Sequence, residues 1–286
     1  MRGLLVVNKF LNTDKFSDIY SRLSSAFAVQ GAGLSLCTNA DFLSDAGSPL
    51  TFLEKPDFIL FWDKDILLAR RFEDAGIPVF NSAESIEICD NKAKMHLALR
   101  GLPMPETYIS PMTFPNIGFS DLSFLDEIEK KLGYPIIIKE AFGSFGAQVY
   151  MAKNHTELFE ITKAHETVPL IFQKPVSESL GRDIRINTVG GRAVAAMMRK
   201  SDGDFRSNIT LGGETVPYSP TDAEIALAEE ASRRLGLDFA GIDILFGENG
   251  PILCEVNSNA HFKSTYDCTG INLAELIAEH IIRKCR

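Results

Sequence analysis

Two carboxylates and an amide on two short apolar segments are the residues of this sequence most suited to chemistry. Residues 241–245 (Gly-Ile-Asp-Ile-Leu) carry Asp243, and residues 253–257 (Leu-Cys-Glu-Val-Asn) carry Glu255 and Asn257. The glycine-rich sequence between the segments predicts a hairpin with a five-residue loop. Because side chains alternate across a strand, Glu255 and Asn257 share one face, and this loop length places Asp243 opposite Glu255.

These three side chains predict a cation site. Facing carboxylates repel each other unless a cation lies between them, and negatively charged oxygen ligands suit Mg²⁺ or Mn²⁺ bound to phosphates. The alternative, for the acids taken alone, is a solvated hairpin face on which they only aid solubility.

Lys139 and a glycine-containing loop form a second candidate set. Lys139 ends the apolar run 136–138, and residues 143–146 (Gly-Ser-Phe-Gly) follow it. Glycines allow backbone N–H groups to approach phosphate oxygens, and a lysine at a strand end adds a point charge. No Gly-Lys-Ser/Thr follows, so the loop is not a Walker loop. Taken singly, this loop is also typical of an ordinary turn, and Lys92 at a predicted helix start is typical of a solvated lysine.

Two clusters that contain arginine complete the candidates. In Gly-Arg-Asp-Ile-Arg, Asp183 and Arg185 are two residues apart and share a strand face. Arg199 and Arg206 flank a predicted Asp-Gly turn, which can aim both guanidinium groups into one cleft. Surface salt bridging is the default interpretation of any single arginine, and the joint presence of the clusters favours a site.

The elements that must position these residues begin with alternating strands and helices. This alternation predicts a small parallel-sheet α/β domain over about residues 1–85. No Gly-x-Gly-x-x-Gly follows the first strand, so the sequence gives no support for NAD binding. The predicted strands are 3–8, 33–37, 57–62 and 77–80, and the clearest helix is 14–30.

From residue 82 onward the pattern changes to mixed α+β. Residues 82–100 predict helix, with Asp90 or Asn91 as a cap before residues 92–100, and residues 110–123 predict a loop. The later strands and helices follow from period-2 and period-3.6 apolar patterns. Strands are predicted at 136–139, 148–152, 170–173, 183–189, 192–198, 242–246 and 252–256, and helices at 124–132, 156–165, 221–235 and 272–284.

Composition limits the classes of partner. The 286 residues carry a formal charge of −9, which argues against sequence-independent binding to nucleic acid. No apolar run reaches the roughly 18 residues that span a bilayer, and the first ten residues lack a signal-peptide pattern. We therefore expect a cytoplasmic protein with no membrane partner. The five cysteines show no Cys-x-x-Cys pair, which predicts reduced thiols.

Taken in chain order, these motifs resemble the ATP-grasp fold, and they most resemble its RimK-type branch of ribosomal-protein glutamate ligases and amino-acid ligases. The resemblance covers about residues 82–286 and rests on Lys92, Lys139, the glycine loop, Gly-Arg-Asp-Ile-Arg, Gly-Asp-Phe-Arg-Ser-Asn, Gly-Ile-Asp-Ile and Glu-Val-Asn. It implies α/β and α+β architecture. The implied parts are a parallel-sheet pre-ATP-grasp domain at 1–81, an ATP-grasp N-terminal lobe at 82–170 and a C-terminal lobe at 171–286.

The resemblance also assigns roles to residues of this sequence. Asp243, Glu255 and Asn257 would hold magnesium or manganese, with two ions expected. Catalytic contacts to the phosphates and to an acyl-phosphate would come from Arg199, Arg206 and Asn208. ATP would be bound at its phosphates by Lys92, Lys139, Gly143, Ser144 and Gly146, at adenine by the backbone of Gln173, Lys174, Pro175 and Val176, and at the ribose or the substrate by Asp183.

The implied activity is that of an ATP- and magnesium-dependent carboxylate–amine ligase, which forms an acyl-phosphate before an amine attacks it. The partners would be a small acid and an amine, such as an amino acid or peptide, and the resemblance suggests a homo-oligomer. After Asn257 the sequence departs from the family's usual Ala-Ser-Pro-Gly, and we expect Lys263, with His261 as a further candidate, to recognise a polar or anionic substrate group. The alternatives are a dipeptide or natural-product ligase, a nucleotide-binding regulatory protein without turnover, and a phosphotransferase to a small acid.

Overall fold

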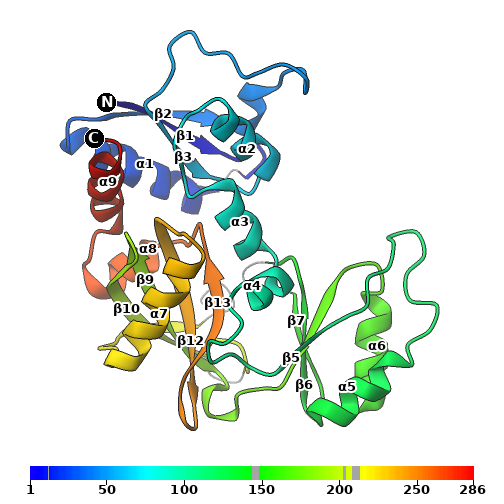
Figure 1. Ribbon diagram of the computed structural model, residues 1–286. Coiled ribbons are helices and arrows are strands. Elements are labelled where there is room, and N and C mark those ends of the chain that lie inside the picture. The colour runs from blue at the N-terminus through cyan, green and yellow to red at the C-terminus, as the bar shows by residue number, and fades with distance from the viewer. Residues whose placement is uncertain (12, 144–147, 202–203, 208–212) are drawn as a thin grey trace.

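The described residues form three β-sheets, and Figure 1 shows how they are arranged. The computed structural model describes residues 1–286 with the exception of residues 12, 144–147, 202–203 and 208–212. Within the described residues, no helix is both long enough and apolar enough to cross a membrane. The chain therefore combines one parallel sheet with two antiparallel sheets, in agreement with the predicted α/β and α+β architecture.

The first sheet is parallel and has the strand order β2-β1-β3-β4. Strand β3 is apolar at every position and buried on both faces, as is usual for parallel strands that helices cover. The prediction of a parallel-sheet unit at the N-terminal end is confirmed. Its elements are β1 (Arg2–Val7), α1 (Asp14–Val29), β2 (Gly33–Thr38), the 3-10 helix η1 (Asn39–Phe42), β3 (Phe58–Trp62), α2 (Ile66–Asp74) and β4 (Val79–Phe80).

Two short helices follow the first sheet. They meet at Asn91, whose extended backbone interrupts the helical path and whose side chain accepts a hydrogen bond from the N–H of Lys94. Asn91 is therefore the cap that the sequence analysis considered beside Asp90. The helices are α3 (Ala83–Asp90) and α4 (Lys92–Ala98), so Lys92 occupies the first turn of α4.

The second sheet is antiparallel, with the order β5-β8-β6-β7, and α5 and α6 cover one face of it (Figure 1). The sequence analysis missed β5, because three residues are too few for a periodic pattern. The elements are β5 (Thr107–Ile109), α5 (Phe124–Leu132), β6 (Ile136–Glu140), β7 (Val149–Ala152), α6 (His155–Ala164) and β8 (Leu170–Gln173).

The third sheet is antiparallel and has the order β11-β10-β9-β12-β13. Helix α7 packs on one of its faces, while α9 packs against α1 and shares a core with the first sheet. This shared core fixes the first sheet to the third. The elements are η2 (Ser177–Ser179), β9 (Arg182–Val189), β10 (Arg192–Lys200), β11 (Glu214–Pro217), α7 (Asp222–Arg234), β12 (Phe239–Gly247), β13 (Gly250–Asn257), α8 (Lys263–Thr269) and α9 (Leu273–Lys284).

Candidate active site

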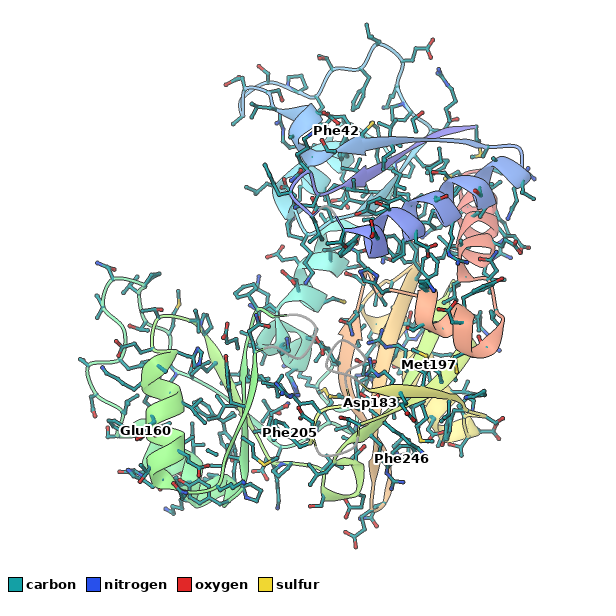
Figure 2. The ribbon with its side chains drawn as sticks, turned by 180° about the vertical axis from the view of Figure 1, so that it is seen from behind. Phe42, Glu160, Asp183, Met197, Phe205 and Phe246 are labelled. Carbon is teal, nitrogen blue, oxygen red and sulfur yellow. The ribbon has the colours of Figure 1, made fainter. Side chains whose placement is uncertain are left out.

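A cavity of about 820 Å³ lies where the three sheets meet. Every predicted site residue that the structure describes lies in its wall: Lys92, Lys139, Gly143, Gln173, Lys174, Pro175, Val176, Asp183, Arg199, Arg206, Asp243, Glu255 and Asn257. Figure 2 labels Asp183, Met197 and Phe205, which also line this cavity. The predicted residues Ser144, Gly146 and Asn208 lie outside the described residues.

The β12–β13 hairpin places Asp243 directly opposite Glu255, as predicted. The reason given for this pairing was wrong, because the loop is a two-residue turn between the paired Gly247 and Gly250. A turn of this length alone would pair Asp243 with Cys254. A bulge at Cys254 adds one residue to β13 and thereby restores the pairing with Glu255.

Four charged side chains form a chain of ion pairs across the floor of the cavity. Arg185 donates from Nε and Nη2 to the two carboxylate oxygens of Asp243. Arg199 Nη2 lies 3.0 Å from Asp243 Oδ2, and Arg199 Nε donates to Asp183 Oδ1 at 2.6 Å. All four are at most 8% exposed, so their charges are largely removed from water and must balance each other.

The pKa of Asp243 reflects this balance. Burial opposes its ionisation, but the charges of Arg185 and Arg199 outweigh burial and hold the pKa of Asp243 below its ordinary value. For Arg199, burial opposes the charged form, yet the two neighbouring carboxylates raise its pKa. Asp243 is therefore an anion over the whole neutral range, as a metal ligand must be.

In the structure, cationic side chains contact both hairpin carboxylates. Arg185 and Arg199 balance Asp243, and Lys92 Nζ lies 3.5 Å from Glu255 Oε1. Asn257 Nδ2 lies 3.5 Å from Asp243 Oδ2, so the three predicted metal ligands share one face of the hairpin. Two carboxylates and an amide oxygen on one face are a donor set that fits a hard divalent cation.

The predicted phosphate-binding side of the cavity brings two lysines near the glycine loop. Lys92 is 7% exposed and donates from Nζ to the carbonyl of Gly143 at 3.0 Å. A side chain at Gly143 would place its Cβ 2.9 Å from the Gln148 amide oxygen, so a glycine suits this close approach. Lys139 Nζ lies 3.9 Å from Sγ of Cys254, the residue that precedes Glu255.

The segment predicted to read adenine joins β8 of the second sheet to the third sheet. Gln173 is 2% exposed, and its amide Nε2 lies 2.9 Å from both Thr107 Oγ1 and His96 Nε2. The Lys174 N–H already donates to the backbone carbonyl of Glu106, and Pro175 has no N–H. In this segment the N–H of Val176 is therefore the backbone donor left to a base.

His96 makes the free energy of unfolding of the protein dependent on pH. Burial and, to a smaller extent, the charge of Lys139 lower the pKa of His96 from 6.5 to about 4. Above about pH 6.5 the ring is neutral in both the folded and the unfolded chain, so it does not change the free energy of unfolding. As the pH falls from 6.5 to 4, only the unfolded chain takes up the proton, and we expect the free energy of unfolding to fall by on the order of 3 kcal/mol.

Urea unfolding of the wild type and of His96→Gln at pH 7 and pH 4.5 would measure this effect. The glutamine cannot be protonated, so the variant should lose less stability than the wild type between the two pH values. An equal loss in both proteins would show that His96 is not the titrating group.

Arg206 lies in the cavity wall with Arg199, so the expectation that both arginines reach one cleft is confirmed for their side chains. Arg206 Nη2 lies 2.7 Å from Asp204 Oδ2, and its guanidinium lies over the Phe205 ring at 5.5 Å. The hydrogen bonds to Asp204 raise the pKa of Arg206. The predicted turn between the two arginines falls on residues 202–203, outside the described part of the chain.

Arg185 is the main residue that the sequence analysis did not place in the site. The signal was available, because Arg185 is two residues from Asp183 and the two side chains were expected on one strand face. Its pairing with Asp243 follows from the alignment of β9 with β12, in which Asp243 is directly opposite Arg185. Lys263 and His261 also line the cavity, and their roles in substrate recognition remain predictions.

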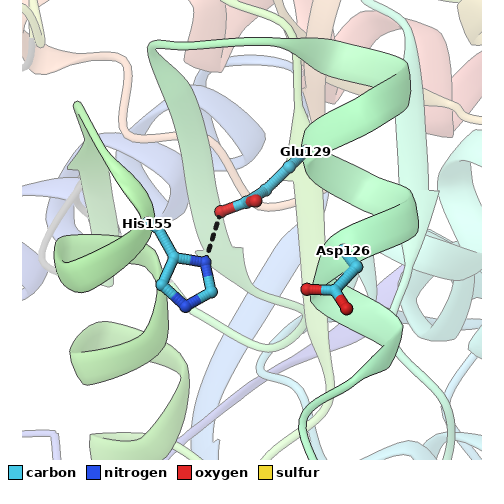
Figure 3. Close-up of side chains that lie close together, drawn as sticks. All are labelled: Asp126, Glu129 and His155. Atoms are coloured by element: carbon cyan, nitrogen blue, oxygen red, sulfur yellow. Dashed lines mark hydrogen bonds and ion pairs between the residues drawn. The ribbon is translucent and has the colours of Figure 1, made fainter.

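A second cluster of potential ligands lies outside the cavity, on the second sheet's helices. Asp126, Glu129 and His155 present ligand atoms within 4.8 Å of one another, as Figure 3 shows. Glu129 Oε1 lies 2.8 Å from His155 Nδ1 and also accepts from the Tyr134 hydroxyl. These hydrogen bonds tie α5 to the start of α6, so the cluster has a structural explanation.

Comparison with known proteins identifies the class of this fold. The ATP-grasp ligase PsnB with its minimal precursor matches with a TM-score of 0.72 at 17% identity, over 98% of each chain. D-alanine–D-alanine ligase from Bacillus anthracis, complexed with ATP, matches with a TM-score of 0.74 at 17% identity, over 100% of this chain and 97% of that one. The fold is therefore that of the ATP-grasp ligases.

Sequence comparison then gives the family. The RimK-like ATP-grasp domain model matches residues 90–281. N-acetylaspartylglutamate synthase A of Homo sapiens is 36% identical over 223 residues, which are 76% of this chain and 56% of that protein. Beta-citrylglutamate synthase B of Danio rerio is 34% identical over 77% of this chain and 54% of that protein. The chain belongs to the RimK-like ATP-grasp family.

The chain spans just over half the length of these two relatives. A relative of similar length is the uncharacterized MG012 homolog of Mycoplasma pneumoniae, which is 32% identical over 91% of this chain and 93% of that protein. The similarity therefore extends beyond the ATP-grasp domain into the N-terminal sheet.

Proposed function

We propose that this protein is an ADP-forming carboxylate–amine ligase that uses ATP and a divalent metal to make an amide or peptide bond. The observation that carries the proposal is the cavity itself, which gathers two lysines, two buried arginines and the hairpin carboxylates around one space. Such a site suits phosphoryl transfer, in which catalysis consists mostly of positioning and charge neutralisation. The names of the relatives, which are synthases and ligases, support the same class.

In this proposal the hairpin residues Asp243, Glu255 and Asn257 hold the metal, with two Mg²⁺ or Mn²⁺ ions. When bound, the ions would offset the negative charge of the phosphates. Lys92 and Lys139 bind the phosphates as point charges, and Val176 donates a backbone hydrogen bond to the base. The metal assignment is supported by the two carboxylates and the amide oxygen of the hairpin, which are a donor set that fits a hard divalent cation.

The reaction follows in two steps. A substrate carboxylate oxygen attacks the γ-phosphorus of ATP, which releases ADP and leaves an acyl-phosphate. The ammonium group of the amino acid loses one proton, its nitrogen then attacks the acyl carbon, phosphate leaves, and the nitrogen gives up a second proton. Arg199 and Arg206 stabilise negative charge on the transferring group, because guanidinium groups pair with phosphate oxygens in a fixed fork.

The substrates follow from the relatives' names only as a proposal. N-acetylaspartylglutamate synthase, beta-citrylglutamate synthase and a probable alpha-L-glutamate ligase all name glutamate. We therefore infer that the amine is an amino acid, with L-glutamate as the first to test, and that the acid is a small carboxylic acid or a peptide.

ADP release with ATP and magnesium tests the function. The acids would be N-acetylaspartate, citrate and short peptides, each with and without L-glutamate or another amino acid, and Asp243→Asn plus Glu255→Gln is the control. We expect turnover that requires an acid and an amine and that is lost in the control. ATP binding without turnover on a broad panel would favour a regulatory protein, and release without an amine would favour a phosphotransferase.

We also propose the division into units at residues 1–81, 82–170 and 171–286. The second of these boundaries falls within Leu170–Gln173, the last strand of the second sheet in chain order. A cytoplasmic location and a homo-oligomeric state remain predictions, and sedimentation of the purified protein would test the second.

A further inference from the structure

The cavity extends beyond the proposed nucleotide and metal residues toward the first sheet. This second part lies between the C-terminal ends of β1 and β3 and the segment that follows β13. Two of its lysines pair with nearby aspartates, Lys64 with Asp90 and Lys263 with Asp267. The charges of these four side chains therefore balance within the protein.

Asp63 is different from these paired aspartates. It directly follows β3, is only 8% exposed and lines the cavity. Its carboxylate accepts hydrogen bonds from the Asn8 amide at 3.2 Å and from the Lys64 backbone N–H at 2.7 Å. Among the described residues it forms no ion pair with a cationic side chain. Burial raises the pKa of Asp63, and its hydrogen bonds and the charge of Lys64 offset this only in part. A cationic group bound beside Asp63 would therefore stabilise its ionised form.

The hydrogen bonds around Asp63 fix its position. The Phe10 N–H donates to Asn8 Oδ1, which orients the Asn8 amide so that its nitrogen faces Asp63. The Asn259 amide nitrogen donates to the Asp63 backbone carbonyl at 2.9 Å, which joins the segment after β13 to this point. The carboxylate is thus held in one orientation at the cavity wall.

Buried polar atoms without a hydrogen-bond partner gather beside Asp63. Within the described structure these are Asn259 Oδ1, Trp62 Nε1 and Tyr20 Oη. Trp62 and Asn259 line the cavity, and the charge of Asp63 helps burial to raise the pKa of Tyr20. Buried polar atoms are normally hydrogen-bonded, so this region has an incomplete set of partners that a bound molecule can supply.

We propose that Asp63 binds the ammonium group of the amino-acid substrate and thereby selects an amine-bearing molecule. The proposal rests on the proposed function, because it names the group that recognises one substrate of that reaction. An ammonium carries one positive charge and three donors, which match the Asp63 carboxylate, for which the described residues supply no ion pair, and the amide oxygen of Asn259. Trp62 offers a donor, which suits the carboxylate of the same amino acid.

The position of Asp63 also places the proposed amine site apart from the proposed nucleotide site. The nucleotide and metal residues lie on the second and third sheets, whereas Asp63 and Asn8 belong to the first sheet's unit. The amine would therefore enter from the first sheet toward the transferring group. In this arrangement the first sheet's unit supplies substrate selection, and the other two sheets supply the chemistry.

Steady-state kinetics of Asp63→Asn test the proposal with ATP, the acid found active and L-glutamate. We expect the KM for L-glutamate to rise by about 10- to 100-fold, because a charge-assisted hydrogen bond is lost. The KM for ATP should stay within about twofold, since Asp63 lies outside the nucleotide residues. Asp74→Asn, an exposed aspartate in α2 that does not line the cavity, is the matched control.

Calorimetric titration makes the test independent of turnover. Protein loaded with a non-hydrolysable ATP analogue and magnesium would be titrated with L-glutamate and with glutarate, which lacks the ammonium. The wild type and Asp63→Glu should prefer L-glutamate, and Asp63→Asn should lose that preference while it binds the nucleotide analogue normally. An Asp63→Asn protein that binds the nucleotide and still prefers L-glutamate would overturn the proposal. Absence of ADP release with this preference intact in the wild type would instead overturn the ligase function alone.

Discussion

Glu255→Gln is expected to reduce ADP release by at least about 10²-fold while leaving the free energy of unfolding within about 1 kcal/mol of the wild type. In our proposal Glu255 contributes a negative charge that binds the metal. In the structure its carboxylate lies 3.5 Å from Lys92 Nζ. A neutral glutamine of the same shape removes the charge and keeps the packing. ADP release and urea unfolding would measure the two effects separately.

Asp243→Asn is expected to differ from Glu255→Gln in its effect on stability. Asp243 lies between Arg185 and Arg199 in a buried ion-pair chain, so the substitution removes the ion-pair partner that Arg185 has among the described residues and leaves Arg199 paired with Asp183. We expect the same loss of turnover together with a loss of about 3 kcal/mol in unfolding free energy. Glu248→Gln, at the exposed tip of the same hairpin, should change neither quantity. Wild-type turnover in Glu255→Gln would contradict the proposed metal site.

Arg199→Lys is expected to lower kcat by about 10²- to 10³-fold. Lysine keeps the positive charge but lacks the planar fork with which Arg199 reaches Asp183 and Asp243 at the same time. If Arg199 stabilises the transferring phosphoryl group, the loss should appear in kcat, with a smaller change in the KM for ATP. A loss of about 1 to 3 kcal/mol in stability should accompany it, because buried carboxylate oxygens lose donors.

Arg192→Lys is the matched control for this prediction. Arg192 begins the same strand β10, but its side chain is 80% exposed and pairs with Glu229 at the surface. The control should keep both kcat and stability. An Arg199→Lys enzyme with normal kcat would show that Arg199 has only a structural role in the ion-pair chain.

The sequence by itself determined the elements that depend on local patterns. The strand Leu170–Gln173 was predicted with its correct limits, and the helices that became α5 and α7 were placed within one residue at each end. These elements have strong apolar periodicity or capping residues, which act over a few neighbouring positions. The same local alternation correctly placed Asp183 and Arg185 on one strand face. Strand β5 was missed because it has only three residues, whereas β11 (Glu-Thr-Val-Pro) and helix α8 were missed because they are mostly polar and give little apolar periodicity.

Only the tertiary structure decided which charges meet. The pairing of Asp243 with Glu255 depended on a bulge at Cys254 that sequence spacing does not reveal. The contact of Arg185 with Asp243 depended on the alignment of β9 with β12, strands that are more than fifty residues apart. The position of Asp63 likewise required three segments distant in sequence to meet at the wall of the cavity. Residue types reveal what chemistry a side chain can perform, but burial and long-range contacts decide which partner neutralises it, and those follow from how the sheets pack.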